Sequence, residues 1–219
     1  MSALRKLASQ AAIYGLSSIL GRMLNYLLVP LYTSVFTSPE QYGLITELYA
    51  YAAFFNIIYT LGMETTYFRF ASRQGQRQGE FIALPCLSVV GRVSVFFSLG
   101  FWIYSDQVAS FMGYAGQGHL IRWMALILAL DAVMALPFAK LRLQGRATRF
   151  AALRLTNIGL TIGLNLAFLL LVPWLGQRGG WAAFTAFYDP ARQVEYVLLA
   201  NLVASAVLPL LLRQRTWGG

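Results

Sequence analysis

Six apolar runs dominate this sequence, and each is about as long as a lipid bilayer is thick. A helix needs about 20 mostly apolar residues to cross a membrane. These runs do not alternate between apolar and polar residues, as the strands of a membrane barrel would. We therefore expect an all-α, polytopic bundle of about six transmembrane helices. The predicted spans are residues 8–35, 42–62, 81–104, 120–138, 153–174 and 196–212.

The composition supports lipid as the solvent of this chain. Of its 219 residues, 58% are hydrophobic and only 11% are charged, whereas soluble domains carry about 25% charged residues. The mean hydropathy is +0.59. The net charge of +9 does not indicate a nucleic-acid partner, because the basic residues lie at the ends of the apolar runs and form no single basic face.

The basic residues also predict an orientation. Lysine and arginine favour the cytoplasmic side of short loops. With six spans, only Arg178 and Arg192 fall on one side of the membrane. The other side holds twelve: Arg5, Lys6, Arg69, Arg73, Arg77, Lys140, Arg142, Arg146, Arg149, Arg154, Arg213 and Arg215. We expect both termini to be cytoplasmic, which requires an even number of spans. The first run is too long for the core of a cleavable signal peptide, so we expect it to stay as a span.

Charged residues inside the runs are the strongest functional signal. Arg22 and Arg92 lie at the centres of the first and third runs, and Asp131 lies in the fourth. A charge at this depth costs from roughly 2.5 to more than 10 kcal/mol, unless it faces water or a partner charge. The polar residues within the runs also include Asn25, Glu47, Asn157 and Asn165. Together they predict a polar pathway through the bilayer.

The arginines are candidates for binding an anionic head group such as a diphosphate. Arg22 and Asn25 are three residues apart and share a helix face. The planar guanidinium donates two parallel hydrogen bonds to a phosphate, so we expect Arg22, Asn25 and Arg92 to bind the head group. Alternatively, Glu47 neutralises Arg22 and Asp131 neutralises Arg92. The two acids are therefore candidates for charge pairing, or for coupling to an ion or proton.

The sequence carries few signs of an enzyme. Its eight acidic residues are scattered, and it contains no P-loop. The single cysteine, Cys86, excludes an internal disulfide and a multi-cysteine metal site. The single histidine, His119, lies in a glycine-rich segment, where we expect an exposed loop residue. We expect no catalytic residue, no metal and no cofactor.

Three segments resemble a known family. Residues 12–36 read AIYGLSSILGRMLNYLLVPLYTSVF, residues 38–43 read SPEQYG and residues 62–70 read GMETTYFRF. They resemble the N-terminal part of the flippases of O-antigen and lipid-linked oligosaccharides. These polysaccharide-biosynthesis exporters belong to the multidrug/oligosaccharidyl-lipid/polysaccharide exporter superfamily. The basic segment after the fourth run fits the same family.

The resemblance implies a function and an architecture. It implies a multi-pass transporter in the bacterial inner membrane that moves an undecaprenyl-diphosphate-linked glycan to the outer leaflet, as in lipopolysaccharide synthesis. In relatives, arginines facing a central cavity hold the diphosphate, and Arg22 matches such a position better than Arg92 does. Relatives have twelve to fourteen helices in two lobes. Residues 1–219 would then form the N-terminal lobe alone, as a fragment or a half-length product that pairs with a second lobe or a second copy.

Two other functions remain open. The chain could be a six-helix small-molecule transporter that acts as a dimer. It could also be an enzyme or an accessory subunit of cell-surface glycan synthesis, although it lacks the acidic and histidine motifs that such chemistry uses. In each case membrane lipid surrounds the chain, and no nucleic acid is expected.

Overall fold

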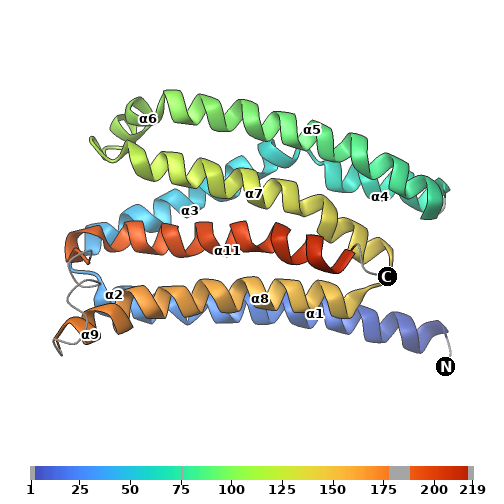
Figure 1. Cartoon of the computed structure of the whole chain (residues 1–219), viewed down its shortest axis with the longest axis horizontal. Helices are drawn as coiled ribbons and strands as arrows, with labels where there is room; N and C mark the ends of the chain where they lie inside the picture. The colour runs from blue at the N-terminus through green and yellow to red at the C-terminus, as the bar shows by residue number, and fades with distance from the viewer. Residues whose placement is uncertain (1–2, 75, 178–187, 217–219) are drawn as a thin grey trace.

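The computed structural model describes residues 3–74, 76–177 and 188–216, and the regular structure in these ranges is all helical. The all-α prediction is confirmed. The main helices, labelled in Figure 1, are α1 (Ala3–Tyr26), α2 (Leu28–Val35), α3 (Pro39–Thr60), α4 (Met63–Gln74), α5 (Gln76–Ile103), α6 (Ser105–Phe111), α7 (Gly118–Leu143), α8 (Ala147–Leu166), α9 (Val172–Gln177) and α11 (Gln193–Thr216). A π-helical turn, Ala167–Leu171, joins α8 to α9, and a 3₁₀ turn, Pro190–Arg192, precedes α11.

Several helices are long and apolar enough to cross a membrane. Four are continuous: Phe81–Ile103, Gly118–Leu143, Ala147–Gly176 and Gln193–Leu212. A fifth span results if α3 and α4 form one bent unit. These helices contain the predicted ranges 120–138, 153–174 and 196–212 and all but the last residue of 81–104, so the polytopic bundle is confirmed. The total of six stays a prediction, because the described apolar stretch in α1 is shorter, Ala11–Gly21.

The first predicted span is broken into two helices. α1 ends at Tyr26 and α2 begins at Leu28. The cause is Pro30, because a proline ring clashes with the carbonyl four residues earlier and removes one backbone hydrogen bond. The Leu27 amide bonds to the carbonyls of both Met23 and Leu24, at 3.3 and 3.2 Å. The backbone stays helical at Leu27, with φ −67° and ψ −19°, so the interruption lies in the hydrogen bonds and not in the direction of the chain.

The polar segment 69–79, which separates the second and third predicted spans, is largely helical. Residues 69–74 belong to α4 and residues 76–79 to α5. The chain bends by 42° between α3 and α4, where Leu61 and Gly62 have positive φ angles of 47° and 64°. α4 is amphipathic: Tyr67 and Ala71 are buried, while Arg69 is exposed. Arg69 and Ser72 therefore lie on the exposed face of a helix.

The helices pack in layers around α7. In Figure 1, α5 forms one edge of the bundle, α1 and α8 form the other, and α7 and α11 lie between them. α7 contacts α5, α11, α3, α4 and α6. Ala132 and Ala139 of α7 are fully buried and Ala125 nearly so. Such small side chains let neighbouring helices approach closely.

Both ends of the chain lie at the same end of the bundle. α1 begins and α11 ends there (Figure 1), and we call it the terminal end. The α7–α8 junction, with Arg146 and Arg149, lies at the same end. The α2–α3 and α6–α7 junctions lie at the opposite end. This arrangement fits an even number of membrane crossings.

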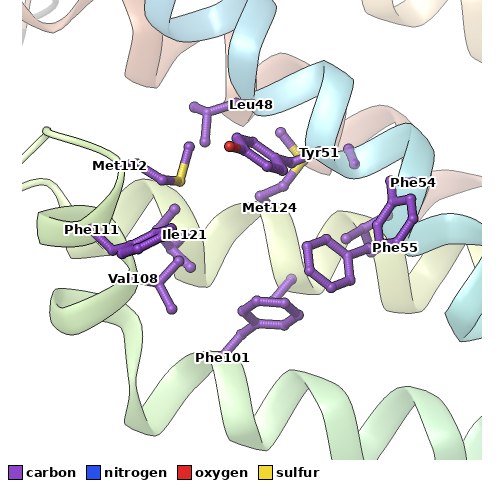
Figure 2. Close-up of a pocket in the computed structure, with 13 residues that line it drawn as sticks. Leu48, Tyr51, Phe54, Phe55, Phe101, Val108, Phe111, Met112, Ile121 and Met124 are labelled. Atoms are coloured by element: carbon purple, nitrogen blue, oxygen red, sulfur yellow. The ribbon is translucent and has the colours of Figure 1, made fainter.

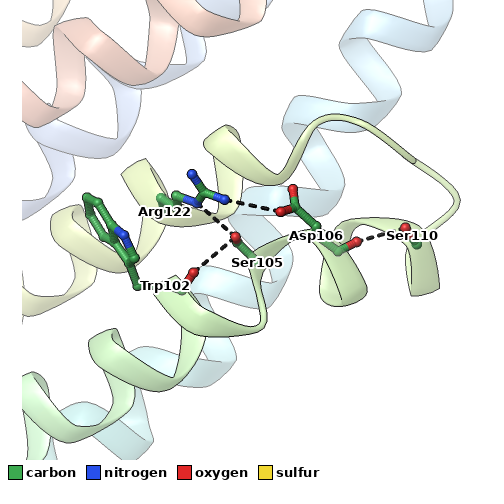
Figure 3. A network of polar contacts seen from close by, with 5 residues as sticks. All are labelled: Trp102, Ser105, Asp106, Ser110 and Arg122. Atoms are coloured by element: carbon green, nitrogen blue, oxygen red, sulfur yellow. Dashed lines mark hydrogen bonds and ion pairs between the residues drawn. The ribbon is translucent and has the colours of Figure 1, made fainter.

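The opposite end is held by a polar network between α6 and α7 (Figure 3). Arg122 donates from Nε to Ser105 Oγ at 2.8 Å and from Nη2 to Asp106 Oδ2 at 3.1 Å. A Cβ on Gly118 would lie 2.0 Å from Asp106 Oδ1, so glycine leaves the room that this carboxylate occupies. The glycine-rich segment around His119, residues 105–119, thus proves to contain all of α6 and the start of α7. Arg122 adds a third basic residue to this side, where we had predicted two.

His119 also has a role that the sequence did not suggest. Its Nε2 lies 3.1 Å from Glu195 Oε1, so the contact ties the start of α7 to the start of α11. We had expected an exposed loop residue.

Candidate functional site

A polar cleft of about 600 Å³ lies between the helices. α7, α8 and α11 form most of its wall, and α1, α3 and α4 contribute the rest. Most of its lining is polar, which is unusual for a space inside an apolar bundle. Its polar lining residues are Asn56, Thr60, Glu64, Asp131, Arg142, Arg154, Asn157, Thr161 and Asn201.

Helical spacing places these side chains on common faces. On α7, Asp131 and Arg142 are eleven residues apart, close to three helical turns, so both face the cleft. On α8, Arg154, Asn157 and Thr161 follow at steps of three and four residues. Each helix thus turns a polar stripe toward the cleft.

Arg142 joins three helices near the terminal end of the cleft. Its guanidinium forms an ion pair with Glu64 of α4, and both side chains are 35% exposed. The same guanidinium lies 5.4 Å from the ring centre of Phe68 and 5.7 Å from that of Phe150. Cations at this distance from an aromatic face are attracted to it. Arg142 therefore ties α7 to α4 and α8.

Asp131 lies midway along α7, deep among the helices, yet its side chain is exposed because it faces the cleft. It accepts a hydrogen bond from Ser205 Oγ at 2.8 Å. Next to Ser205 on α11, one turn away, Asn201 donates to the Val197 carbonyl at 3.0 Å and to the Tyr49 hydroxyl. A carboxylate has about four acceptor sites, so Asp131 keeps acceptor capacity toward the cleft.

Arg154, on α8, is a second arginine that lines the cleft. It is exposed and makes no salt bridge within the described part of the chain. It is close enough to Asp131 and Arg142 to interact with both electrostatically. An arginine has five N–H donors. Arg154 can therefore bind an anion that enters the cleft without first breaking an ion pair.

The structure describes the backbone of Arg22 and Asn25, in α1, but not their side chains. Their neighbour Gly21 lines the cleft. A Cβ on Gly21 would lie 2.7 Å from Ile158 Cδ1, so α1 packs closely on α8 at this level. The head-group roles of Arg22 and Asn25 stay predictions.

The other predicted site residues divide between the cleft and the rest of the bundle. Asp131 lines the cleft, whereas Arg92 is exposed on α5 and is not among the lining residues. Asp131 accepts a hydrogen bond from Ser205, and no salt bridge joins it to Arg92 among the described side chains. The head-group role of Arg92 stays a prediction without support from its position.

Glu47 lies away from the cleft and accepts a hydrogen bond from the Tyr114 hydroxyl at 2.9 Å. This bond to Glu47 raises the pKa of Tyr114 above its usual value. The contact fastens the α6–α7 connection to α3. Whether Glu47 pairs with Arg22 lies outside the described side chains.

Sequence reasoning missed Arg142 and Arg154 as site residues, because we counted both only as orientation signals. Their helical spacing from Asp131 and Asn157 was the available signal. Glu64, which pairs with Arg142, was also missed as a site residue. Asn165, one of the predicted intramembrane residues, is buried and bonds to Tyr32 and to the Thr161 carbonyl, which is a packing role.

A second pocket, of about 270 Å³, lies between α3, α5, α6 and α7 (Figure 2). Its walls are apolar side chains such as Phe55, Phe101 and Met124. It offers little to a charged ligand, so the polar cleft is the better candidate site. Among the described residues, no three His, Cys, Asp or Glu side chains lie close enough together to hold a metal ion.

A family comparison identifies the chain at the level of its family. Residues 35–182, about two thirds of the sequence, match the model of a family described as polysaccharide biosynthesis protein. The chain belongs to this family. The matched segment runs from the end of α2 through α9, so it includes Glu64, Asp131, Arg142 and Arg154 of the cleft. The resemblance to a polysaccharide-biosynthesis family is therefore confirmed. No curated protein and no solved structure matches the chain significantly.

Proposed function

We propose that this polysaccharide biosynthesis protein is a lobe of a flippase for a polyprenyl-diphosphate-linked oligosaccharide or polysaccharide precursor. The observation that carries the proposal is the polar cleft with an unpaired arginine, Arg154, inside an apolar helical bundle. A passive membrane anchor has no use for such a cleft, because its polar groups raise the energy of the inserted state. A transporter needs one, because its substrate brings charge into the bilayer.

The chemistry of the cleft suits a diphosphate. Arginine binds phosphate oxygens through two parallel hydrogen bonds, and Arg154 has these donors available. The volume of the cleft, about 600 Å³, lies in the usual range for small-molecule sites. This space suits the diphosphate and the first sugar better than a whole glycan. Asn157 and Asn201 offer amide groups to sugar hydroxyls.

The acids of the cleft balance its arginines when no substrate is bound. Glu64 pairs with Arg142, and Asp131 lies near Arg154. An arriving diphosphate binds Arg154 directly and competes with Glu64 for Arg142. Because Glu64 can pair with Arg142 again, the site can release the substrate after transport. No covalent change in the substrate is required, so we propose a transporter and not an enzyme.

A second lobe, or a second copy, completes the proposed transporter. In transporters built from repeats, one bundle rocks against the other around a site near the membrane midplane. A single bundle supplies one wall of such a site. Arg22, which follows the cleft residue Gly21 on α1, remains a candidate to contact the same head group.

We place the terminal end on the cytoplasmic side of a bacterial inner membrane, from the excess of basic residues there. Cysteine labelling tests this orientation. In a Cys86→Ala background, Ala115→Cys at the opposite end should react with a membrane-impermeant maleimide on spheroplasts. Ser72→Cys, on the exposed face of α4, should react only after the membrane is opened. Labelling of Ser72→Cys in sealed spheroplasts would overturn the orientation.

Two substitutions that remove charges of opposite sign from the cleft test the binding site. In Asp131→Asn, the purified chain should bind polyprenyl diphosphate about tenfold more tightly, because a like charge near the anion is removed; this corresponds to roughly 1.4 kcal/mol. Arg154→Gln should change affinity in the opposite direction. Polyprenol, which has no phosphate, should show neither effect. Weaker diphosphate binding in Asp131→Asn, or equal competition by polyprenol, would contradict the proposal.

A further inference from the structure

The exposed face of α5 carries a charge that the described part of the chain leaves without a partner. Arg92 lies at the midpoint of the apolar helix Phe81–Ile103 and is exposed. It forms no salt bridge within the described chain. The midpoint is about 16 Å along the axis from either end of this helix. Arginines near helix ends can reach the membrane interface, but the backbone of Arg92 lies at the middle of the helix, where both interfaces are farthest away.

The surface around Arg92 has the character of a helix-packing site. Its neighbours along the same face are strongly exposed apolar side chains, namely Phe81, Leu84, Val95, Phe96, Leu99 and Ile103. Beside Arg92, Ser88 and Gly91 are small, and a Cβ on Gly91 would meet nothing within 4 Å. Small residues at such a position let a second helix approach closely. The face therefore offers a cation, open space beside it and apolar surroundings. This combination fits a second helix that is apolar and carries one acidic residue.

We propose that this face of α5 packs against a transmembrane helix from outside residues 1–219 that carries an aspartate or glutamate at the bilayer midplane. The carboxylate would pair with Arg92 and remove the cost of a lone charge in hydrocarbon. Charge complementarity therefore decides the partner, and the apolar neighbours of Arg92 supply the packing surface.

A second copy of the chain fits this face poorly. Among the described acids, Glu47 lies within a predicted span, Glu64 lies two residues after that span, and Asp131 lies within another. They are bound to Tyr114, Arg142 and Ser205. A symmetric contact through α5 would also bring two Arg92 side chains together. Lipid phosphates lie at the membrane surface, well away from this depth.

This inference does not depend on transport. It holds if the polar cleft binds a different anion, because it rests on α5 alone. The edge position of α5 in Figure 1, away from α1 and α8, separates the two surfaces.

Synthetic helices provide the test. One probe is a transmembrane helix of leucine and alanine with a central glutamate, and its matched control has glutamine there. Energy transfer between probe and full chain is measured in phosphatidylcholine vesicles. We expect the glutamate helix to bind at least about tenfold more tightly, as a charge-assisted pair at this depth predicts. Arg92→Gln should abolish this preference and Arg92→Lys should keep it. Arg69→Gln, which removes an exposed arginine from α4, should also keep it.

Three results would overturn the inference. Equal binding of the two helices by the wild-type chain would remove the role of charge. Self-association of the chain that is lost in Arg92→Gln would identify a second copy as the occupant. A preference that disappears when anionic lipid is added would assign Arg92 to a lipid phosphate. Helix content and thermal unfolding of each variant establish that it is folded.

Discussion

Arg154→Gln should lower surface polysaccharide to the level of a strain that lacks the gene. The assay complements a deletion strain with the full-length gene and measures surface glycan at equal protein level. Among the described side chains of the cleft, Arg154 is the cation without an ion pair, so its loss leaves the diphosphate without its first donor. Hydrogen bonds to charged groups contribute about 1.5–3 kcal/mol each, so we expect binding to weaken by roughly ten- to a hundredfold.

Arg149 provides a matched control for this variant. It lies on the same helix and is exposed, but it does not line the cleft. Arg149→Gln removes the same charge from α8 and should leave surface polysaccharide unchanged. Arg154→Lys keeps the charge but not the two-pronged geometry, so we expect partial export. Normal export in Arg154→Gln would show that this residue does not hold the substrate. The same assay on Arg22→Ala tests the role predicted from sequence.

Reversing the charge of Glu64 or Arg142 alone should cause the largest loss of stability. Glu64→Arg places two cations together beside the cleft, and Arg142→Glu places two carboxylates together. Because both side chains are about one third exposed, solvent screens part of the repulsion, and we expect each variant to lose about 1–2 kcal/mol. Thermal unfolding in detergent measures this loss.

The double variant Glu64→Arg/Arg142→Glu separates stability from function. It restores an ion pair between α4 and α7, so most of the lost thermal stability should return. It also moves the cation away from Phe68 and Phe150, so recovery should be incomplete. Export should stay low, because the cleft then has a carboxylate where Arg142 was. A double variant as unstable as the sum of the two single changes would show that the pair does not couple α4 to α7.

Apolar length was enough to predict most of the bundle from sequence. The runs at 81–104, 120–138, 153–174 and 196–212 lie almost entirely within helices, because hydrocarbon leaves the backbone no other way to satisfy its hydrogen bonds. The break at Leu27 was harder to see, because Pro30 acts one turn before its own position. The polar segment 69–79 carried no clear signal of its helices, because the described part of α4 is amphipathic, and an amphipathic pattern is harder to see than a uniformly apolar one.

The candidate site was predicted only in part. Asp131 was found, because a charge inside an apolar run is conspicuous in sequence. Arg142 and Arg154 were missed, because they lie near helix ends, where basic residues are ordinary orientation signals. Their place in the cleft depends on how α4, α7 and α8 pack together. Arg92 shows the reverse case. Its position at the centre of an apolar run is conspicuous in the sequence, but the structure places it on an outer face and not in the cleft.

The most direct test of the cleft as the head-group site is protection of a cysteine within it. Ala135 lines the cleft on α7, and Ala206 is exposed on α11 outside the cleft lining. In a purified Cys86→Ala background, Ala135→Cys is modified by a small water-soluble thiol reagent, with Ala206→Cys as the control. Polyprenyl diphosphate should slow modification at Ala135→Cys alone, polyprenol should not, and Arg154→Gln should remove the protection. Equal rates at Ala135→Cys with and without polyprenyl diphosphate, at concentrations where the chain binds it, would place the head group elsewhere.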